Sequence, residues 1–290
     1  MAKPDWNREG RDWPHRAASR FVEAGGLRWH VQVMGSGPVV LLLHGTGAAT
    51  HSWRGLMPLL AHHFTVVAPD LPGHGFTSTP RDAGMALPGM AKGIAALLEA
   101  LALTPALTVG NSAGAAIAVR MVIDGALHGP IVAINGALMP FAGPAAVLFP
   151  TLAKLLFVNP FVPRIFALQG QSHTMVKSFL ERSTGSVIDG EGIRFYKRLL
   201  ASSGHCAAPL TMMANWDLDS LKRDYPRFTS PLLLLHAEND AAIPPSDGLK
   251  IKALIPQGEA RMLKGLGHLA HEEDPVLVAK IIIEWAGEQL

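Results

Sequence analysis

Short apolar segments alternate with helical patterns along most of the chain, and this alternation constrains the fold more than any other feature. The expected strands are Leu27–Met34, Val39–Leu43, Thr65–Ala68, Leu107–Val109, Ile131–Ile134, Leu232–His236 and Glu259–Leu263. The expected helices lie near residues 53–62, 89–102, 113–124, 246–255 and 275–289. Apolar strands separated by helices are typical of a mostly parallel sheet covered on both faces. The predicted fold class is therefore α/β, with ligands bound at the carboxyl ends of the strands.

The composition allows a large core and argues against some functions. The chain has 290 residues, 49% of them apolar, which is enough for one large domain with an insertion or for two small domains. Its net charge of +2 comes from 25 basic and 23 acidic side chains, so a nucleic-acid-binding function is not favoured. The single cysteine, Cys206, excludes an intramolecular disulfide and is typical of a reducing compartment. Because residues 1–21 are polar where a secretory signal would be apolar, we expect a cytoplasmic protein.

The expected domain organisation is a core with an arm and an insertion. Residues 1–20 lack helical periodicity and predict an N-terminal arm, residues 21–136 and 216–290 predict the core domain, and residues 137–215 predict a helical cap. Between Asp124 and Lys177 the only charged side chains are those of Lys154 and Arg164. Prolines interrupt this apolar stretch, which disfavours a single membrane-spanning helix and favours short helices lying over the strand ends.

A serine flanked by two glycines follows the strand expected at residues 107–109. The stretch Gly110-Asn111-Ser112-Ala113-Gly114 matches the G-x-S-x-G pattern of a nucleophile elbow, a tight strand-to-helix turn that lifts a hydroxyl above a parallel sheet. The same pattern also arises by chance in a glycine-rich chain. The assignment therefore depends on whether suitable partners occur elsewhere.

One partner is a glycine-rich loop after an earlier strand. His44-Gly45-Thr46-Gly47 directly follows the apolar segment that ends at Leu43. A loop in this place can direct the backbone N–H of Thr46 at a developing oxyanion, and the N–H of Ala113 would be the second donor. The alternative is a plain glycine turn.

The remaining partners are an acid and a base. Asp240 follows the strand near residue 236, and His268 lies in a glycine-containing turn before the last helix. The order Ser112, Asp240, His268 is the order of nucleophile, acid and base in hydrolases with an elbow. Ser112 needs His268 to accept its proton, and His268 needs Asp240 to fix its tautomer and balance its charge. Glu238 is the alternative acid, and His271 is the alternative base.

Five motifs then occur in one order: "LLLHGTG", "VVAPDLPGHGFT", "GNSAG", "HAENDAAIPP" and "GLGHLAHEEDP". Together they resemble the α/β-hydrolase fold superfamily over residues 21–290. The segments "DWPHRAASRFVEAGGLRWHVQ" and "HGTGAATHSW" further resemble the magnesium-chelatase accessory proteins of bacteriochlorophyll biosynthesis, the BchO type. This narrower resemblance implies a role around magnesium insertion into protoporphyrin IX in a photosynthetic bacterium, with magnesium chelatase subunits as partners. It does not identify the substrate of Ser112.

The expected function is that of a serine hydrolase acting on an apolar acyl compound. We expect Phe141, Phe149 and Phe157 of the cap, with Trp216, to line the substrate pocket. Carbon–carbon bond hydrolysis by the same triad stays open, and the alternative function is a non-catalytic porphyrin-binding or delivery protein. The histidines lack acidic or cysteine neighbours at ligand spacing, so we expect no metal site and no cofactor. The apolar cap also predicts peripheral contact with a membrane surface.

Overall fold

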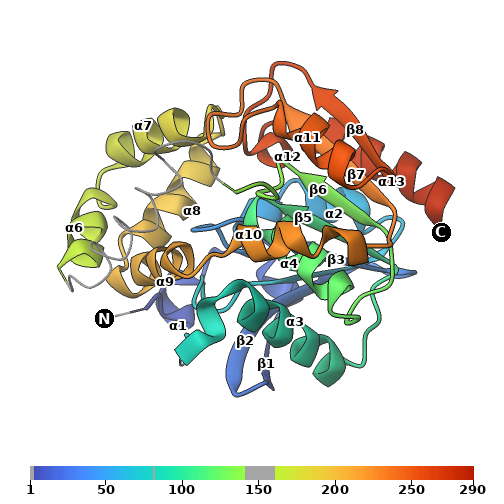
Figure 1. The fold of residues 1–290 in the computed structure, drawn as a ribbon. Helices are drawn as coiled ribbons and strands as arrows, with labels where there is room; N and C mark the ends of the chain where they lie inside the picture. The colour runs from blue at the N-terminus through green and yellow to red at the C-terminus, as the bar shows by residue number, and fades with distance from the viewer. Residues whose placement is uncertain (1–2, 81, 141–160) are drawn as a thin grey trace.

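One mixed sheet organises the fold in the computed structural model, which describes residues 3–80, 82–140 and 161–290 (Figure 1). Its strands follow the spatial order β1-β2-β4-β3-β5-β6-β7-β8. Their bounds are β1 (Ser19–Ala24), β2 (Leu27–Met34), β3 (Val39–Leu43), β4 (Thr65–Pro69), β5 (Leu107–Asn111), β6 (Ile131–Ile134), β7 (Leu232–Ala237) and β8 (Gly258–Leu263). β2 runs antiparallel to β1 and β4, and the pairs from β4 to β8 are parallel. The predicted α/β fold with a mostly parallel sheet is confirmed.

The central strands are buried on both faces, as their continuous apolar sequences predict. Leu41 of β3 pairs with Val67 of β4 on one side and with Thr108 of β5 on the other. Every residue of β5, β6 and β7 is buried. Branched aliphatic side chains suit such a position because they pack well against neighbours on a pleated surface.

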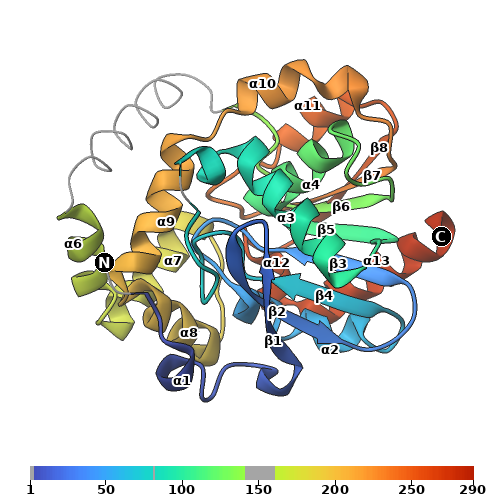
Figure 2. The same ribbon diagram turned by 90° about the horizontal axis from the view of Figure 1, so that it is seen from below.

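Helices cover both faces of the sheet (Figure 2). One face carries α3 (Leu87–Leu101), α4 (Ala113–Ile123), α10 (Leu218–Arg223) and α11 (Asp247–Leu254), and the other carries α2 (Leu56–Leu60) and α13 (Pro275–Gln289). Ile94, Ile117 and Ile251 belong to the core on the first face, and Leu60 and Ile282 belong to the core on the second. The sheet therefore separates two apolar layers. The remaining short elements are α1 (Trp6–Glu9), α12 (Ala270–Glu273), η1 (Arg16–Ala18), η2 (Thr50–Trp53), η3 (Asp82–Met85) and η4 (Tyr225–Arg227).

Among the described residues of the predicted insertion, four helices gather at one end of the sheet. They are α6 (Val162–Gln169), α7 (His173–Thr184), α8 (Gly190–Leu200) and α9 (Ser203–Ala214), seen at the left of Figures 1 and 2. The side chains of Ser172, Asp189 and Ser202 cap the N-termini of α7, α8 and α9 by accepting a backbone N–H of the first turn. Phe141, Phe149 and Phe157 lie outside the described residues. In the described part of the chain, no helix has the length and apolar character needed to cross a bilayer.

The N-terminal segment contains regular secondary structure, although its sequence lacks helical periodicity. It contains α1, and β1 begins at Ser19 and forms a hairpin with β2. Gly25 and Gly26 connect the two strands with φ values of 56° and 74°, as two-residue hairpin turns require. β1 is not among the strands expected from the sequence, although the Gly-Gly pair is a signal for it. Asp12 forms ion pairs with Arg194 and Arg198, which attach the segment to α8.

Candidate active site

Ser112 occupies a sharp turn between β5 and α4. Its φ of 52° and ψ of −117° lie in a region that residues with a Cβ rarely adopt. Backbone hydrogen bonds hold this conformation: the N–H of Ser112 donates to the carbonyl of Ile134 at 3.0 Å, and its carbonyl accepts from Ala115 and Ala137 at 3.1 and 3.0 Å. The surrounding structure therefore fixes a strained serine at the carboxyl end of a buried strand.

The two glycines beside Ser112 allow a close approach of backbone segments. A Cβ on Gly110 would overlap the backbone of Ala115 in the first turn of α4. A Cβ on Gly114 would overlap the carbonyl groups of Leu43 and His44, at the end of β3. Each glycine of the pattern thus meets backbone that a side chain would displace, which argues against a chance occurrence of the motif.

Asp240 and His268 lie in contact at the ends of neighbouring strands β7 and β8. His268 Nδ1 is 2.8 Å from Asp240 Oδ2, and both side chains are buried. Asp240 Oδ1 accepts the backbone N–H groups of Ala242 and Ile243 at 2.7 and 2.8 Å, which fixes the carboxylate in its loop. Because the carboxylate is an acceptor, Nδ1 carries the proton and Nε2 keeps a lone pair.

The alternative acid and base lie in other environments. Glu238 is exposed, and its carboxylate accepts the backbone N–H of Gly265 at 2.9 Å. His271 is fully buried, its Nε2 is 2.8 Å from Ser52 Oγ, and burial lowers its pKa to about 3. Asp240 and His268 therefore contact each other, whereas Glu238 and His271 each contact other residues.

Two asparagines that the sequence reasoning missed brace the loop of His268. The side-chain amides of Asn111 and Asn135 donate to the backbone carbonyl of His268 at 3.2 and 2.9 Å. Asn135 has a φ of 48°, and its Oδ1 accepts the N–H of Ala237 at 2.7 Å. Both residues directly follow or end an apolar strand, at the sheet edge where ligands bind. A polar amide at that position was the available signal.

The Thr46 loop is a tight turn that lies against Ser112. The N–H of Ala48 donates to the carbonyl of Gly45 at 3.2 Å, and Gly47 has the positive φ, 79°, of the third position in a type II turn. A Cβ on Gly45 would lie 3.1 Å from the Cβ of Ser112. The half-buried Thr46 is therefore held close to the serine. Ala113 begins α4, and the first N–H groups of a helix have no partner within it.

His44 connects this turn to the loop after β4. Its Nδ1 donates to the carbonyl of Gly45 at 2.8 Å, and its Nε2 accepts the N–H of Leu71 at 2.9 Å. Burial lowers the pKa of His44, which keeps the ring neutral and able to accept at Nε2. The histidine thus has a structural reason to precede the glycines.

Trp216 lies between α9 and α10, half-buried, and packs against the core cluster on the face of α3 and α4. Among the residues that the structure describes, no cluster of three or more histidine, cysteine and acidic side chains could hold a metal ion.

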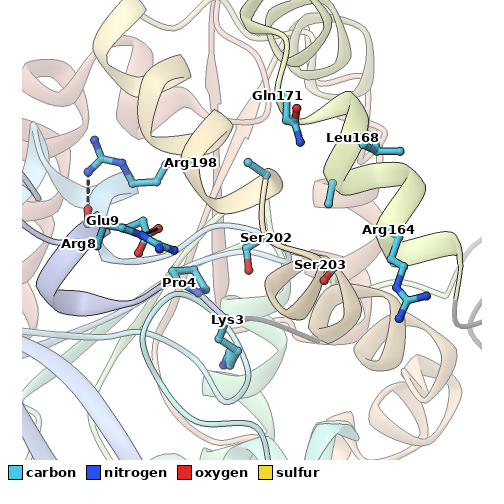
Figure 3. Close-up of a pocket in the computed structure, with 12 residues that line it drawn as sticks. Lys3, Pro4, Arg8, Glu9, Arg164, Leu168, Gln171, Arg198, Ser202 and Ser203 are labelled. Atoms are coloured by element: carbon cyan, nitrogen blue, oxygen red, sulfur yellow. Dashed lines mark hydrogen bonds and ion pairs between the residues drawn. The ribbon is translucent and has the colours of Figure 1, made fainter.

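A cavity of about 470 Å³ lies elsewhere, between the N-terminal segment and helices α6, α8 and α9 (Figure 3). Lys3, Arg8, Arg164 and Arg198 contribute to its wall, and Ser112, Asp240 and His268 do not. Lys3 donates to the carbonyl of Thr77, Arg8 pairs with Glu9, and Arg198 pairs with Asp12. Arg164 lies over the ring of Phe161, so each of the four cations has a partner within the chain, and the cavity is separate from the serine.

Comparisons with known proteins identify the family of the chain. The model of the alpha/beta hydrolase family matches residues 40–281. The magnesium-chelatase 30 kDa subunit of Rhodobacter capsulatus is 36% identical over 94% of this chain and 96% of its own length. The 2-hydroxy-6-oxo-2,4-heptadienoate hydrolase of Pseudomonas putida is 28% identical over 86% of this chain and 89% of its own length.

The fold is also found among solved structures. A crystal structure of an alpha/beta hydrolase fold protein from Burkholderia ambifaria superposes with a TM-score of 0.76 at 20% identity, over 92% of this chain and 97% of that chain. The chain therefore belongs to the alpha/beta hydrolase family, the family that its sequence motifs resemble.

Proposed function

We propose that the chain is a serine hydrolase in which Ser112 is the nucleophile, His268 the general base and Asp240 the orienting acid. The observation that carries the proposal is the 2.8 Å contact between His268 Nδ1 and Asp240 Oδ2, at the same sheet edge as the strained Ser112. A strained nucleophile, a base with a fixed tautomer and a buried acid are the three parts that acyl transfer by a serine needs.

In the proposed first step, Ser112 Oγ attacks the acyl carbon of the substrate. His268 Nε2 accepts the hydroxyl proton as the new carbon–oxygen bond forms, and the Asp240 carboxylate balances the imidazolium charge. The carbonyl oxygen becomes an oxyanion, and the N–H groups of Thr46 and Ala113 donate to it. The N-terminus of α4 adds a favourable dipole at the same place.

In the second half, the tetrahedral intermediate expels the leaving group, which takes the proton from His268. A water molecule then attacks the acyl group on Ser112 while His268 accepts a proton from that water. The second tetrahedral intermediate breaks down to the free acid, and His268 returns the proton to Ser112 Oγ. The triad is regenerated, and the net reaction is hydrolysis of one acyl bond.

The proposed substrate is an apolar acyl compound. The sequence of residues 137–215 is rich in apolar side chains, and α7 and α9 of this segment hydrogen-bond to the loops of His268 and Thr46. Trp216, with Phe141, Phe149 and Phe157, remains our proposal for the lining of the substrate pocket. The same attack of Ser112 on a carbonyl carbon can also lead to cleavage of the carbon–carbon bond next to it. The carbon leaving group then takes the proton from His268.

A second candidate function comes from the relative named as a magnesium-chelatase 30 kDa subunit. In that reading the chain is a non-catalytic accessory protein that binds or delivers a porphyrin for magnesium insertion in bacteriochlorophyll biosynthesis, in contact with chelatase subunits and with a membrane surface. Insertion of a metal involves no acyl transfer, so Ser112 would then be dispensable. Quenching of protoporphyrin IX fluorescence by the wild-type protein and by Ser112→Ala tests this reading.

The decisive experiment for the hydrolase proposal is labelling with a fluorophosphonate probe. The wild-type protein is expected to react at Ser112, and Ser112→Ala is expected to lose both the label and nearly all turnover of p-nitrophenyl butyrate, by roughly 10³- to 10⁶-fold. Mass spectrometry of the labelled peptide identifies the site. Equal labelling of the two proteins would rule out Ser112 as the nucleophile.

A further inference from the structure

His205 on α9 connects two loops of the core. Its Nδ1 accepts the backbone N–H of Gly75 at 3.1 Å, and its Nε2 donates to the backbone carbonyl of Gly47 at 3.1 Å. The side chain is fully buried, and burial lowers its pKa to about 4. A neutral ring with its proton on Nε2 is the form that satisfies both contacts, because a protonated Nδ1 could not accept from Gly75.

The contact with Gly47 acts on the turn that contains Thr46. The peptide unit between Gly47 and Ala48 is held on both sides, since its carbonyl accepts from His205 and its N–H donates to the carbonyl of Gly45. The unit between Gly45 and Thr46 lies two peptide units earlier in the same turn, and its carbonyl accepts the N–H of Ala48. It carries the N–H that points toward the oxyanion in the proposed function. Because Gly47 has a positive φ and no side chain to fix it, the turn depends on hydrogen bonds for its shape.

The same face of α9 makes two further contacts with these loops. Residues 205, 208 and 212 are spaced by three and four positions, so they lie on one side of the helix. The Thr46 hydroxyl donates to Met212 Sδ at 3.8 Å. A Cβ on Gly73 would lie 2.9 Å from the Cβ of Ala208, which shows how closely α9 approaches the second loop. One helix face thus contacts both loops, and the first of them, the Thr46 loop, lies against Ser112.

We propose, on the basis of the function proposed above, that His205 is a positioning residue that sets the direction of the Thr46 N–H through its hydrogen bond to Gly47. In consequence α9, a helix of the predicted insertion, takes part in building the oxyanion-binding site as well as covering it. Loss of this bond affects stabilisation of the oxyanion and leaves the recognition of the acyl chain nearly unchanged.

Two substitutions separate the two hydrogen bonds of His205. Glutamine places a side-chain amide near the position of Nε2 and keeps a donor for Gly47, whereas asparagine places an oxygen near the position of Nδ1 and keeps an acceptor for Gly75. The probe is p-nitrophenyl butyrate. We expect His205→Asn to lower kcat by about 10- to 100-fold with KM changed less than about threefold, and His205→Gln to keep kcat within about fivefold.

Cys206→Ala provides the matched control on the same helix. Cys206 is buried beside His205, and its Sγ donates to the carbonyl of Leu200, so its loss perturbs α9 without touching Gly47. We expect kcat for this variant within about threefold of the wild type. A kcat in Cys206→Ala as low as that in His205→Asn, or equal losses in the asparagine and glutamine variants, would reduce His205 to a packing residue and overturn the proposal.

The wild-type protein distinguishes this inference from the function on which it depends. Wild-type protein without fluorophosphonate labelling or esterase activity would contradict the hydrolase proposal itself, and the role of His205 would fall with it. Labelling of the wild type together with unchanged kcat in His205→Asn would contradict the role of His205 alone. If thermal unfolding shows that His205→Asn does not fold, the folded glutamine variant decides: retained kcat supports the role, and a loss beyond about 100-fold overturns it.

Discussion

The backbone N–H of His268 donates to the backbone carbonyl of Thr184 at 2.8 Å, so the last residue of α7 holds the loop of the histidine. The same carbonyl accepts the N–H of Ala241 at 3.3 Å, in the loop of Asp240. Two residues later, Ser186 Oγ accepts the N–H of Leu269 at 2.8 Å. The last residue of α7 therefore bonds to both loops at the ends of β7 and β8, and together with Ser186 it fixes their separation.

Gly185 makes this arrangement sensitive to one methyl group. Its φ is 68°, and an added Cβ would overlap the carbonyl oxygen of Asn239. The left-handed conformation alone costs a residue with a Cβ about 1–2 kcal/mol, and the overlap adds to it. We expect Gly185→Ala to lower the free energy of unfolding by more than about 2 kcal/mol and to lower kcat, as measured by urea unfolding and by ester hydrolysis.

Gly190→Ala is the control for this prediction. Gly190 is the first residue of α8, its φ is not positive, and an added Cβ would meet no atom within 4 Å. Alanine is the better helix former by about 1 kcal/mol, so this variant should be as stable as the wild type or slightly more stable. If the two variants had the same urea midpoint, the segment after α7 would not constrain the fold.

The acid of the proposed triad is tested by comparing two neighbouring carboxylates. We expect Asp240→Asn to lower kcat by about 10⁴-fold, because an amide cannot hold His268 in the tautomer that leaves Nε2 free to accept. Glu238→Gln should leave kcat within a few fold, since Glu238 is exposed and bonds to Gly265. A larger loss of kcat in Glu238→Gln than in Asp240→Asn would show that Asp240 is not the acid of the triad.

Much of the fold was predictable because its signals are local in sequence. The bounds of β2, β3 and β6 match the expected strands residue for residue, and α13 begins at the proline and ends at the residue that the pattern predicts. The tight turns at Ser112 and at Thr46 were predictable for the same reason, since glycines at fixed spacing report backbone conformation directly. The antiparallel β1 was missed because its sequence, unlike that of the central strands, is only half apolar.

The parts of the site that the sequence did not predict depend on tertiary contacts. Asn111, Asn135 and His205 act through hydrogen bonds to segments 23 to 158 positions away, and no local spacing encodes such pairs. His205 also sits on a helix whose packing direction cannot be read from periodicity. The sequence showed which groups could react, and the structure shows which groups hold them.

The buried carboxylate of Glu272 accepts hydrogen bonds from three side chains, and these side chains lie far apart in the sequence. Its carboxylate accepts from Ser52 Oγ and Tyr196 OH at 2.7 Å each, and it pairs with Arg54. Burial raises the pKa of Glu272, and its three donors oppose that shift. We expect Glu272→Leu to lower the free energy of unfolding by about 3–5 kcal/mol, because the Arg54 guanidinium then lacks its buried partner.

Tyr196→Phe is the matched control for Glu272. It removes one of the three hydrogen bonds and leaves the ion pair with Arg54, so a smaller loss of about 1.5–3 kcal/mol, the range for a hydrogen bond to a charged group, is expected. Urea unfolding at pH 7.5 measures both variants. Equal losses would mean that the ion pair with Arg54 adds no more than the hydrogen bond from Tyr196.

His51 should make the protein sensitive to mild acid. Its ring is fully buried among Trp13, Phe195 and Tyr196, and both ring nitrogens lack a hydrogen-bond partner among the described residues. Burial holds the pKa of His51 well below its usual value. The unfolded chain therefore takes up a proton below about pH 6.5 that the folded protein does not, so stability is full above that pH and falls as the pH decreases.

Replacement of His51 by phenylalanine removes this difference in proton uptake between the unfolded and the folded protein. His51→Phe should be at least as stable as the wild type at pH 7.5, because the two unpartnered nitrogens disappear. Between about pH 6 and pH 4.5 its free energy of unfolding should fall less steeply, by about 1.4 kcal/mol per pH unit. The pKa values of His205 and His271 are also lowered, to about 4 and about 3, so the variant keeps part of the acid sensitivity. Urea unfolding at about pH 7.5, 6.0 and 5.0 measures the free energy of unfolding of both proteins across the titration of an unfolded histidine. If this free energy fell with pH equally steeply in the wild type and in His51→Phe, His51 would be protonated in the folded protein.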